Sequence, residues 1–280
     1  FGTTVGFINN IVTKFGIEVS HVSPVDVDEW KAAIKPNTKL FFLETPSNPL
    51  GEVADLEALA ELAHSIGALL VVDNSLLSPA GSQPLKHGAD ISVSSATKAI
   101  DGHGRVMGGV LAGSEELMTQ VAIYCNSCGL AMSPFNAWQL LSGVETLSLR
   151  MEKQFDNALK IAQWLQQQPQ VQAVYYTGLP DHPQAKLIRK QQNGGGVVIG
   201  FEVADQEAAW KIVDGVELFS RTANLGDVRS TITHPWTTTH GRMQPEEKLA
   251  ANIRPGLVRL SVGLEYVDDL IEDLKQVLNK

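Results

Sequence analysis

Two continuous apolar runs frame a helical pattern in the first third of the chain. The runs are residues 39–44 (KLFFLE) and 68–72 (ALLVV), and between them apolar side chains recur at helical spacing after Asp55. Asp55 is a favourable N-cap, and Gly67 is suited to end a helix in the left-handed conformation. Strands buried on both faces of a parallel sheet have continuous apolar sequences of this kind. The pattern therefore predicts a parallel strand–helix–strand unit.

The alternation of strands and helices continues along the rest of the chain. Apolar patterns predict strands at residues 91–94, 106–112, 171–176, 197–203 and 258–262, and helices at residues 206–213 and 267–278. From Pro134 to about Gln168, strong helix formers without an internal proline predict one long helix or two in succession. We expect Trp138 and Trp164 in this stretch to lie in the core.

These elements predict an α/β protein with two domains. A length of 280 residues suits two domains of ordinary size. We expect a mostly parallel sheet with helices on both faces in residues 1–150, which would bind a cofactor. A smaller α+β domain would follow in residues 151–280, with the boundary near Arg150.

Charge and hydropathy exclude several classes of protein. The net charge is −9, and the Lys and Arg residues are scattered, so we expect no nucleic-acid partner. No apolar run approaches the roughly 20 residues that span a bilayer, so we expect no membrane segment. The start at residues 1–4 (FGTT) lacks an initiator Met and the pattern of a signal peptide. We expect a preceding N-terminal part of the large domain that this sequence does not include.

Cysteines and histidines do not predict a metal site. Cys125 and Cys128 form a single Cys-x-x-Cys pair with no second pair, so two reduced loop thiols are favoured over a redox pair or half a zinc site. Reduced thiols indicate the cytoplasm. His234 and His240 have neither the spacing nor the neighbours of metal ligands.

Polar side chains follow three of the predicted strands. Asn48 follows the first strand, Asp73 ends the second, and Ser95, Thr97 and Lys98 follow the third. Ligands of parallel α/β sheets bind beyond the carboxyl ends of the strands, so these side chains are expected at one edge of the sheet.

This set of side chains matches what a pyridoxal phosphate needs. A lysine forms an imine with its aldehyde, a carboxylate faces the ring nitrogen, and hydroxyl groups take the phosphate. From spacing alone, these residues could equally have no cofactor to bind, because Ser-x-Thr-Lys is a common string and an Asp at a strand end often caps a helix.

The wider motifs resemble the Cys/Met-metabolism family of pyridoxal-phosphate enzymes. The resemblance runs in family order along essentially the whole chain, through residues 42–49 (FLETPSNP), 72–74 (VDN), 95–98 (SATK), 101–105 (DGHGR), 107–109 (MGG), 133–138 (SPFNAW), 143–147 (GVETL), 224–227 (NLGD), 234–235 (HP) and 258–265 (VRLSVGLE). The family has the fold-type I architecture of pyridoxal-phosphate transferases.

The resemblance assigns a role to each matching residue. Lys98 would be the catalytic Schiff-base lysine, and Asp73 would pair with the ring nitrogen. Ser95 and Thr97 would bind the phosphate, and Asn48 the ring oxygen. The substrate would be bound by two residues of the C-terminal domain, Arg259 at the α-carboxylate and Asn224 close by.

Within the family, the pattern is most similar to the O-succinylhomoserine sulfhydrylases. This implies a γ-replacement reaction on O-succinylhomoserine, with sulfide as the nucleophile and homocysteine as the product, in methionine biosynthesis. The partners would be a small amino-acid substrate and sulfide, and the assembly a homodimer or homotetramer. Cystathionine γ-synthase or γ-lyase chemistry at the same site remains an alternative, as does a non-catalytic fragment of such an enzyme.

Overall fold

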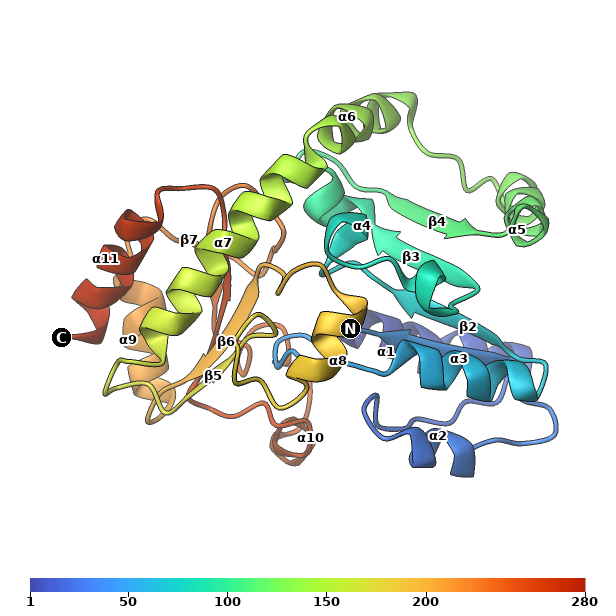
Figure 1. The fold of residues 1–280 in the computed structure, drawn as a ribbon, viewed down its shortest axis with the longest axis horizontal. Coiled ribbons are helices and arrows are strands. Elements are labelled where there is room, and N and C mark those ends of the chain that lie inside the picture. Colours follow the sequence, from blue (N-terminus) through green and yellow to red (C-terminus); the bar gives the residue numbers. More distant parts are fainter. Residues whose placement is uncertain (280) are drawn as a thin grey trace.

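The computed structural model describes residues 1–279, and its N-terminal half is built on a four-stranded sheet (Figure 1). The strands are β1 (Leu40–Glu44), β2 (Leu69–Asp73), β3 (Ile91–Ser95) and β4 (Gly109–Gly113), in that order across the sheet. The pairs β1–β2 and β2–β3 are parallel, whereas β4 runs antiparallel to β3. The predicted parallel strand–helix–strand unit is confirmed.

Helix α3 (Leu56–Ser65) connects β1 and β2 as its sequence predicts. The Asp55 side chain accepts a hydrogen bond from the Ala58 N–H at 3.1 Å and so caps the helix. Four apolar residues at helical spacing are buried on one face, Leu56, Leu59, Ala60 and Ala63. They pack with Phe41, Leu70 and Val72 of the sheet in one apolar cluster. Gly67 has a φ of 69°, which favours glycine.

Shorter helices complete the N-terminal half. They are α1 (Gly2–Asn10), η1 (Val12–Phe15), α2 (Val27–Ala32), α4 (Ser78–Gly81), η2 (Pro84–His87) and the π-helical turn η3 (Ala96–Ile100). No helix among residues 1–279 is both long and apolar enough to cross a membrane.

Three helices follow β4, namely α5 (Glu115–Ser127), α6 (Pro134–Glu145) and α7 (Leu147–Leu165). The stretch after Pro134 is therefore two helices in succession. Two expectations are corrected here. Cys125 lies within α5 and Cys128 caps its C-terminus, so neither is a loop thiol. Trp138 is 61% exposed on α6, because the buried face of that helix is the one with Leu140 and Gly143.

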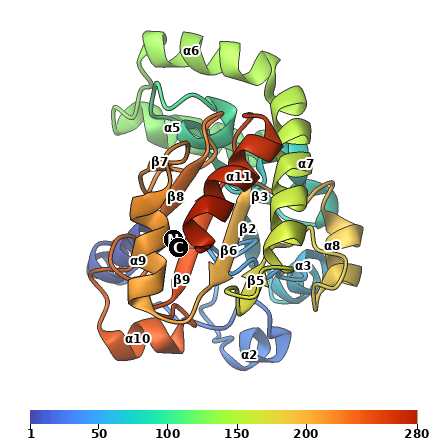
Figure 2. The same ribbon diagram turned by 90° about the vertical axis from the view of Figure 1, so that its left-hand side faces the viewer.

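The C-terminal half contains a second sheet with the order β5-β6-β9-β8-β7. Its strands are β5 (Ala173–Tyr175), β6 (Val198–Glu202), β7 (Ser220–Arg221), β8 (Thr231–Thr233) and β9 (Leu257–Ser261). Only β7 and β8 pair in parallel. The helices of this half are α8 (Ala185–Gln191), α9 (Gln206–Gly215), α10 (Pro245–Ala250) and α11 (Val267–Leu278). Figure 2 shows α7, α9 and α11 together over one face of this sheet, where they form the largest apolar cluster.

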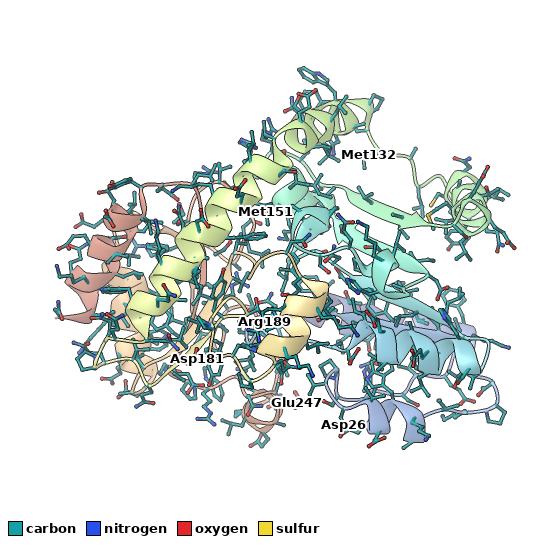
Figure 3. All side chains as sticks on the ribbon, in the orientation of Figure 1. Asp26, Met132, Met151, Asp181, Arg189 and Glu247 are labelled. Atoms are coloured by element: carbon teal, nitrogen blue, oxygen red, sulfur yellow. The ribbon has the colours of Figure 1, made fainter. Side chains whose placement is uncertain are left out.

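Helix α7 contributes to the cores of both halves. Met151, near its start, is fully buried among Ala96, Ile100 and other residues of the first half (Figure 3). Further along, Ala158 and Ile161 belong to the cluster of the second half. The division proposed near Arg150 thus falls inside one continuous helix, and the two-domain description remains a prediction.

Candidate active site

Lys98 lies in the π-helical turn η3, directly after β3. Its backbone is not helical (φ −87°, ψ −128°), and its amine Nζ donates a hydrogen bond to Oδ1 of Asn224 at 3.1 Å. Burial, with a smaller effect from the charge of Arg259, holds the pKa of the Lys98 amine below its ordinary value. A lower pKa increases the fraction of neutral amine, which is the nucleophilic form.

The backbone of the Asn224 loop lies directly against the Lys98 turn. Gly226 has a φ of 74°, and a Cβ there would lie 2.8 Å from the Ala99 nitrogen. Only a residue without a side chain permits this approach. The loop between β7 and β8 is therefore fixed next to Lys98 by backbone shape.

Arg259 occupies the middle of β9 and is 2% exposed. Its Nη2 donates to the carbonyl oxygen of Ala223 at 2.7 Å, and its Nη1 donates to Oδ1 of Asn48 at 3.4 Å. Its Nε is buried without a partner, and no carboxylate within residues 1–279 lies at ion-pair distance from the guanidinium. Burial lowers the pKa of Arg259 to about 10. An uncompensated buried cation of this kind favours an anionic ligand.

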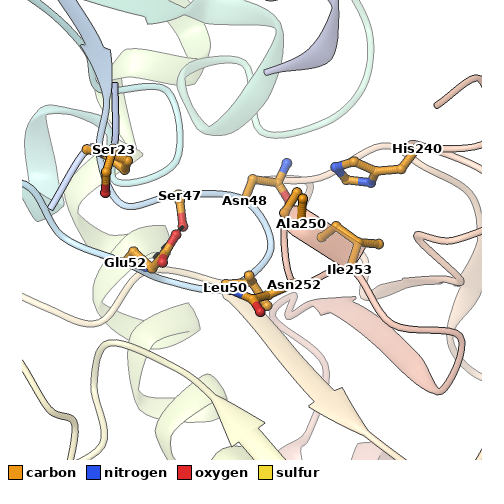
Figure 4. A pocket seen from close by; sticks show the side chains of 11 residues that line it. Ser23, Ser47, Asn48, Leu50, Glu52, His240, Ala250, Asn252 and Ile253 are labelled. Carbon is orange, nitrogen blue, oxygen red and sulfur yellow. Dashed lines mark hydrogen bonds between the residues drawn. The ribbon is translucent and has the colours of Figure 1, made fainter. Parts of the chain in front are cut away.

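Asn48 lies between this guanidinium and a surface cavity. The cavity has a volume of about 440 Å³, and the side chains of Asn48, His240 and Ser23 line it (Figure 4). Burial first, and then the charge of Arg259, lowers the pKa of His240. The cavity shares only Asn48 with the predicted site residues, so it adjoins the site and does not contain it.

Asp73 is the last residue of β2, and only one of its two carboxylate oxygens accepts hydrogen bonds from residues 1–279. Its Oδ1 accepts hydrogen bonds from the Ser75 N–H at 3.0 Å and from the Ser75 hydroxyl at 2.6 Å. Across the described part of the chain, Oδ2 has no hydrogen-bond partner. The Ser75 hydroxyl in turn accepts from the Ser95 N–H at 2.7 Å. The open oxygen is the one that could meet a positively charged ring nitrogen.

The two predicted phosphate ligands differ in their contacts. The Thr97 hydroxyl accepts from the Gly108 N–H at 3.0 Å and donates to the Gly108 carbonyl at a long 3.3 Å. The Ser95 side chain is half-buried, and its hydroxyl makes no hydrogen bond to residues 1–279. Ser95 can donate to a phosphate directly, whereas Thr97 would first give up its bond to Gly108. Their role at the phosphate remains a prediction.

Six of the seven predicted residues, all except Thr97, thus form two hydrogen-bonded groups. Lys98, Asn224, Arg259 and Asn48 are joined directly or through the backbone of residues 223 and 224, and Asp73 is joined to Ser95 through Ser75. Ser95 immediately precedes the Lys98 turn and links the groups. These groups fit pyridoxal phosphate: the amine of Lys98 has a lowered pKa, the carboxylate of Asp73 has an oxygen without a partner among residues 1–279, and the hydroxyl of Ser95 is free to donate.

Sequence reasoning missed Ser75 as part of this arrangement. The spacing Asp-x-Ser, in which a side chain bonds to the backbone two residues on, is a local signal that could have found the first contact. The contact with Ser95 depends on the pairing of β2 with β3, which no local pattern reveals.

Comparisons with known proteins match the chain to one family. Residues 1–279 match the family described as Cys/Met metabolism PLP-dependent enzyme. The O-succinylhomoserine sulfhydrylase of Pseudomonas aeruginosa is 50% identical over 99% of this chain and 69% of its own length. The L-methionine gamma-lyase of Porphyromonas gingivalis is 42% identical over 100% of this chain and 71% of its own length.

The solved structures include a close match in three dimensions. The cystathionine gamma-lyase of Lactobacillus plantarum, complexed with L-serine, has a TM-score of 0.95 at 34% identity, over 99% of this chain and 73% of that one. The predicted fold-type I architecture is confirmed.

Proposed function

Because the chain belongs to the Cys/Met metabolism PLP-dependent enzymes, we propose that it replaces the succinyloxy group on Cγ of O-succinylhomoserine by sulfide, so that the Cγ–O bond breaks, a Cγ–S bond forms, and homocysteine and succinate result. The 50% identity with an O-succinylhomoserine sulfhydrylase supports this choice among the reactions of the family. The observation that carries the proposal is the buried, uncompensated guanidinium of Arg259 next to Lys98.

Arg259 supplies the contact that an α-amino acid requires. Removing a guanidinium from water is costly unless an anion compensates it, and the described residues provide none. The α-carboxylate of the substrate is the natural partner, since a planar guanidinium can bind it through two parallel hydrogen bonds. Asn48 and the Ala223 carbonyl already hold the guanidinium in one orientation.

Lys98 supplies the proton transfers. When bound, the cofactor would withdraw electrons from the substrate Cα, with Asp73 opposite its ring nitrogen. The Lys98 amine, whose lowered pKa favours the neutral form, would accept the Cα proton and return protons later in the cycle. Asn224 holds Nζ in place through a hydrogen bond that does not add charge.

Other reactions at the same site are the nearest rivals. Cystathionine γ-synthesis would use cysteine as the nucleophile, and γ-elimination would use none. The similarity to an L-methionine gamma-lyase keeps elimination in consideration. A non-catalytic fragment is the rival from a different class, because this chain spans only 69% of the sulfhydrylase that it matches.

The proposal includes a homo-oligomer, a dimer or a tetramer. Large apolar side chains are exposed on α5 and α6, among them Ile123, Tyr124, Phe135, Trp138 and Leu141. Exposed apolar patches of this kind mark interaction surfaces. Light scattering on the purified chain would measure the mass of the assembly, and a monomer at all concentrations would contradict this part.

The decisive experiment combines trapping with competition between nucleophiles. The chain is loaded with pyridoxal phosphate and reduced with borohydride, and the adduct is mapped by mass spectrometry; we expect it on Lys98. O-Succinylhomoserine is then supplied with sulfide, with cysteine, or alone. Homocysteine as the main product supports the proposal, whereas cystathionine or a 2-oxo acid favours a rival.

Two lysine variants, one in the site and one on the surface, show whether the adduct is specific to Lys98. Lys98→Ala should lose both the adduct and turnover, and Lys160→Ala, an exposed change on α7, should keep both. A folded, unchanged chain that forms no adduct on Lys98 would refute the proposal.

A further inference from the structure

We propose that Ser75 is a positioning residue of the cofactor site: its hydroxyl fixes the orientation of Asp73 and couples Asp73 to the strand that carries Lys98. This inference rests on the proposed function, because it takes Asp73 as the partner of the cofactor ring nitrogen. Ser75 makes three hydrogen bonds here: its N–H and its hydroxyl both donate to Oδ1 of Asp73, and its hydroxyl accepts from the Ser95 N–H.

The direction of each contact is fixed by chemistry. The Ser95 backbone N–H can only donate, and an ionised Asp73 carboxylate can only accept. The Ser75 hydroxyl must therefore accept from Ser95 at 2.7 Å and donate to Asp73 at 2.6 Å. A hydroxyl has one proton and two lone pairs, so it can do both at once, and an alanine can do neither.

Both bonds that Ser75 donates go to the same carboxylate oxygen. The N–H and the hydroxyl of Ser75 bind Oδ1 of Asp73 and leave Oδ2 open. A distance of 2.6 Å is typical of a strong bond between a hydroxyl and a carboxylate. The carboxylate group is held in one orientation, with the open oxygen available for a ligand.

The contact with Ser95 lies beyond the end of the strand ladder. The pairing of β2 with β3 ends at Asp73 and Val93, followed by one bond from the Asn74 N–H to the Val93 carbonyl at 2.7 Å. From there the chains separate, with Ser95 pairing to Gly109 of β4. The Ser75 hydroxyl is a side-chain link between the end of β2 and the residue that begins the Lys98 turn. A displacement of Asp73 is thereby transmitted to that turn.

The consequence concerns both the affinity and the ionisation of the cofactor. Without the hydroxyl, Oδ1 of Asp73 keeps only the bond from the Ser75 N–H, so its orientation is less restricted and its pairing with the ring nitrogen weakens. A ring nitrogen that loses its positive charge repels the proton on the Lys98–cofactor linkage less, so that linkage should hold its proton to higher pH. A purely structural role for Ser75 would not produce this second effect.

The test compares four chains loaded with pyridoxal phosphate: the unchanged chain, Ser75→Ala, Ser75→Thr and Ser65→Ala. Ser65 is exposed on α3, where its hydroxyl bonds only to the Leu62 carbonyl, so its removal is the matched control. Three quantities are measured: the cofactor dissociation constant, the pH midpoint of the visible absorption band, and the separate values of kcat and KM.

We expect Ser75→Ala to bind the cofactor about tenfold more weakly, the size typical of one hydrogen bond to a charged group. Its absorption midpoint should rise, and kcat should fall more than KM changes. Ser75→Thr, which keeps the hydroxyl, and Ser65→Ala should match the unchanged chain. If Ser75→Ala does not fold, Ser75→Cys, with a similar size and a weak donor, should show the same changes in direction.

The outcomes separate this inference from the proposed function. An unchanged chain that forms no Lys98 adduct refutes the proposed function and this inference with it. A normal adduct, together with a Ser75→Ala variant whose dissociation constant and absorption midpoint equal those of the unchanged chain, refutes only the role of Ser75.

Discussion

The amine of Lys98 and the side-chain oxygen of Asn224 lie 3.1 Å apart, although 126 residues separate them in the sequence. The contact crosses from the first sheet to a loop of the second. The side-chain oxygen of Asn224 carries no charge, and it accepts from an amine whose pKa is already lowered by burial and by Arg259. In the proposed reaction, this lowered pKa would favour the neutral amine that accepts the Cα proton.

Replacing this neutral partner by a charged one should change the pH dependence of the enzyme. In Asn224→Asp a carboxylate would face the amine and raise the pKa of Lys98, because an opposite charge stabilises the protonated form. We expect the rising limb of the pH–rate profile and the formation of the cofactor adduct to move to higher pH. Asn126→Asp, on the exposed side of α5, is the control. An identical profile in both variants would show that Asn224 does not influence the amine.

The variant Arg259→Lys should show whether the positive charge of Arg259 or its planar pair of donors matters for binding the substrate carboxylate. A lysine keeps the positive charge but loses the planar pair of donors that matches a carboxylate. We expect kcat/KM for the amino-acid substrate to fall about 10- to 100-fold, mainly through KM, the effect of losing a charged hydrogen bond. Arg254→Lys, whose side chain is 59% exposed, should leave the kinetics unchanged. A fall in kcat with constant KM would contradict the proposed role in binding.

Asp101 should make stability depend on pH. Burial opposes its ionisation, but hydrogen bonds from the N–H and guanidinium of Arg105 and from the His103 N–H outweigh burial, so the pKa of Asp101 is lowered. A carboxyl whose pKa is lower in the folded state adds stability above its unfolded pKa of about 3.9, and this stability is lost as pH falls through the folded value.

Asp101→Asn should therefore lower the free energy of unfolding by about 1–3 kcal/mol at neutral pH, and by progressively less as the solution is acidified. Urea unfolding across this range would measure the difference. Asp156→Asn, an exposed change in the middle of α7, should show no such trend. A constant difference at all pH values would mean that charge is not the cause.

Arg150 should be required for stability. Its buried guanidinium donates to the carbonyl oxygens of Ala99, Ile100 and Gly143 at 2.8, 3.2 and 2.7 Å. Arg150→Met would remove this donor from all three carbonyls and leave Gly143 only the long bonds from Thr146 at 3.4 and 3.5 Å, at a cost of about 3 kcal/mol or more in the free energy of unfolding. Arg189→Met on α8 is the exposed control (Figure 3). Equal unfolding midpoints for the two variants would contradict this role.

The sequence predicts those helices and strands in which the buried residues follow a regular pattern of apolar positions. The strands β1 and β2 are continuous apolar runs, and α3 has a clear cap and one apolar face. The sequence does not predict β7, because SR is polar and only two residues long, nor β8, because three residues (TIT) are too few to show a periodic pattern.

Burial and long-range contacts were harder to predict than secondary structure. Helix α6 has apolar residues on more than one face, so its sequence does not indicate that Leu140 faces inward and Trp138 outward. Sequence motifs identify Lys98 and Arg259 as candidate site residues. The hydrogen bonds from Lys98 to Asn224 and from Arg259 to Asn48 depend on how the two sheets pack together, which the motifs do not show.

Helix α7 is hydrogen-bonded to both halves of the candidate site. Arg150 holds the carbonyls that follow Lys98, and Gln154, four residues on, donates to the carbonyls of Asp227 and Val262 beside the Asn224 loop and β9. Four residues of helix correspond to a rise of about 6 Å. One helical turn thus ties the Lys98 turn to the loop and strand that carry Asn224 and Arg259, so these segments cannot shift apart without breaking hydrogen bonds of Arg150 or Gln154.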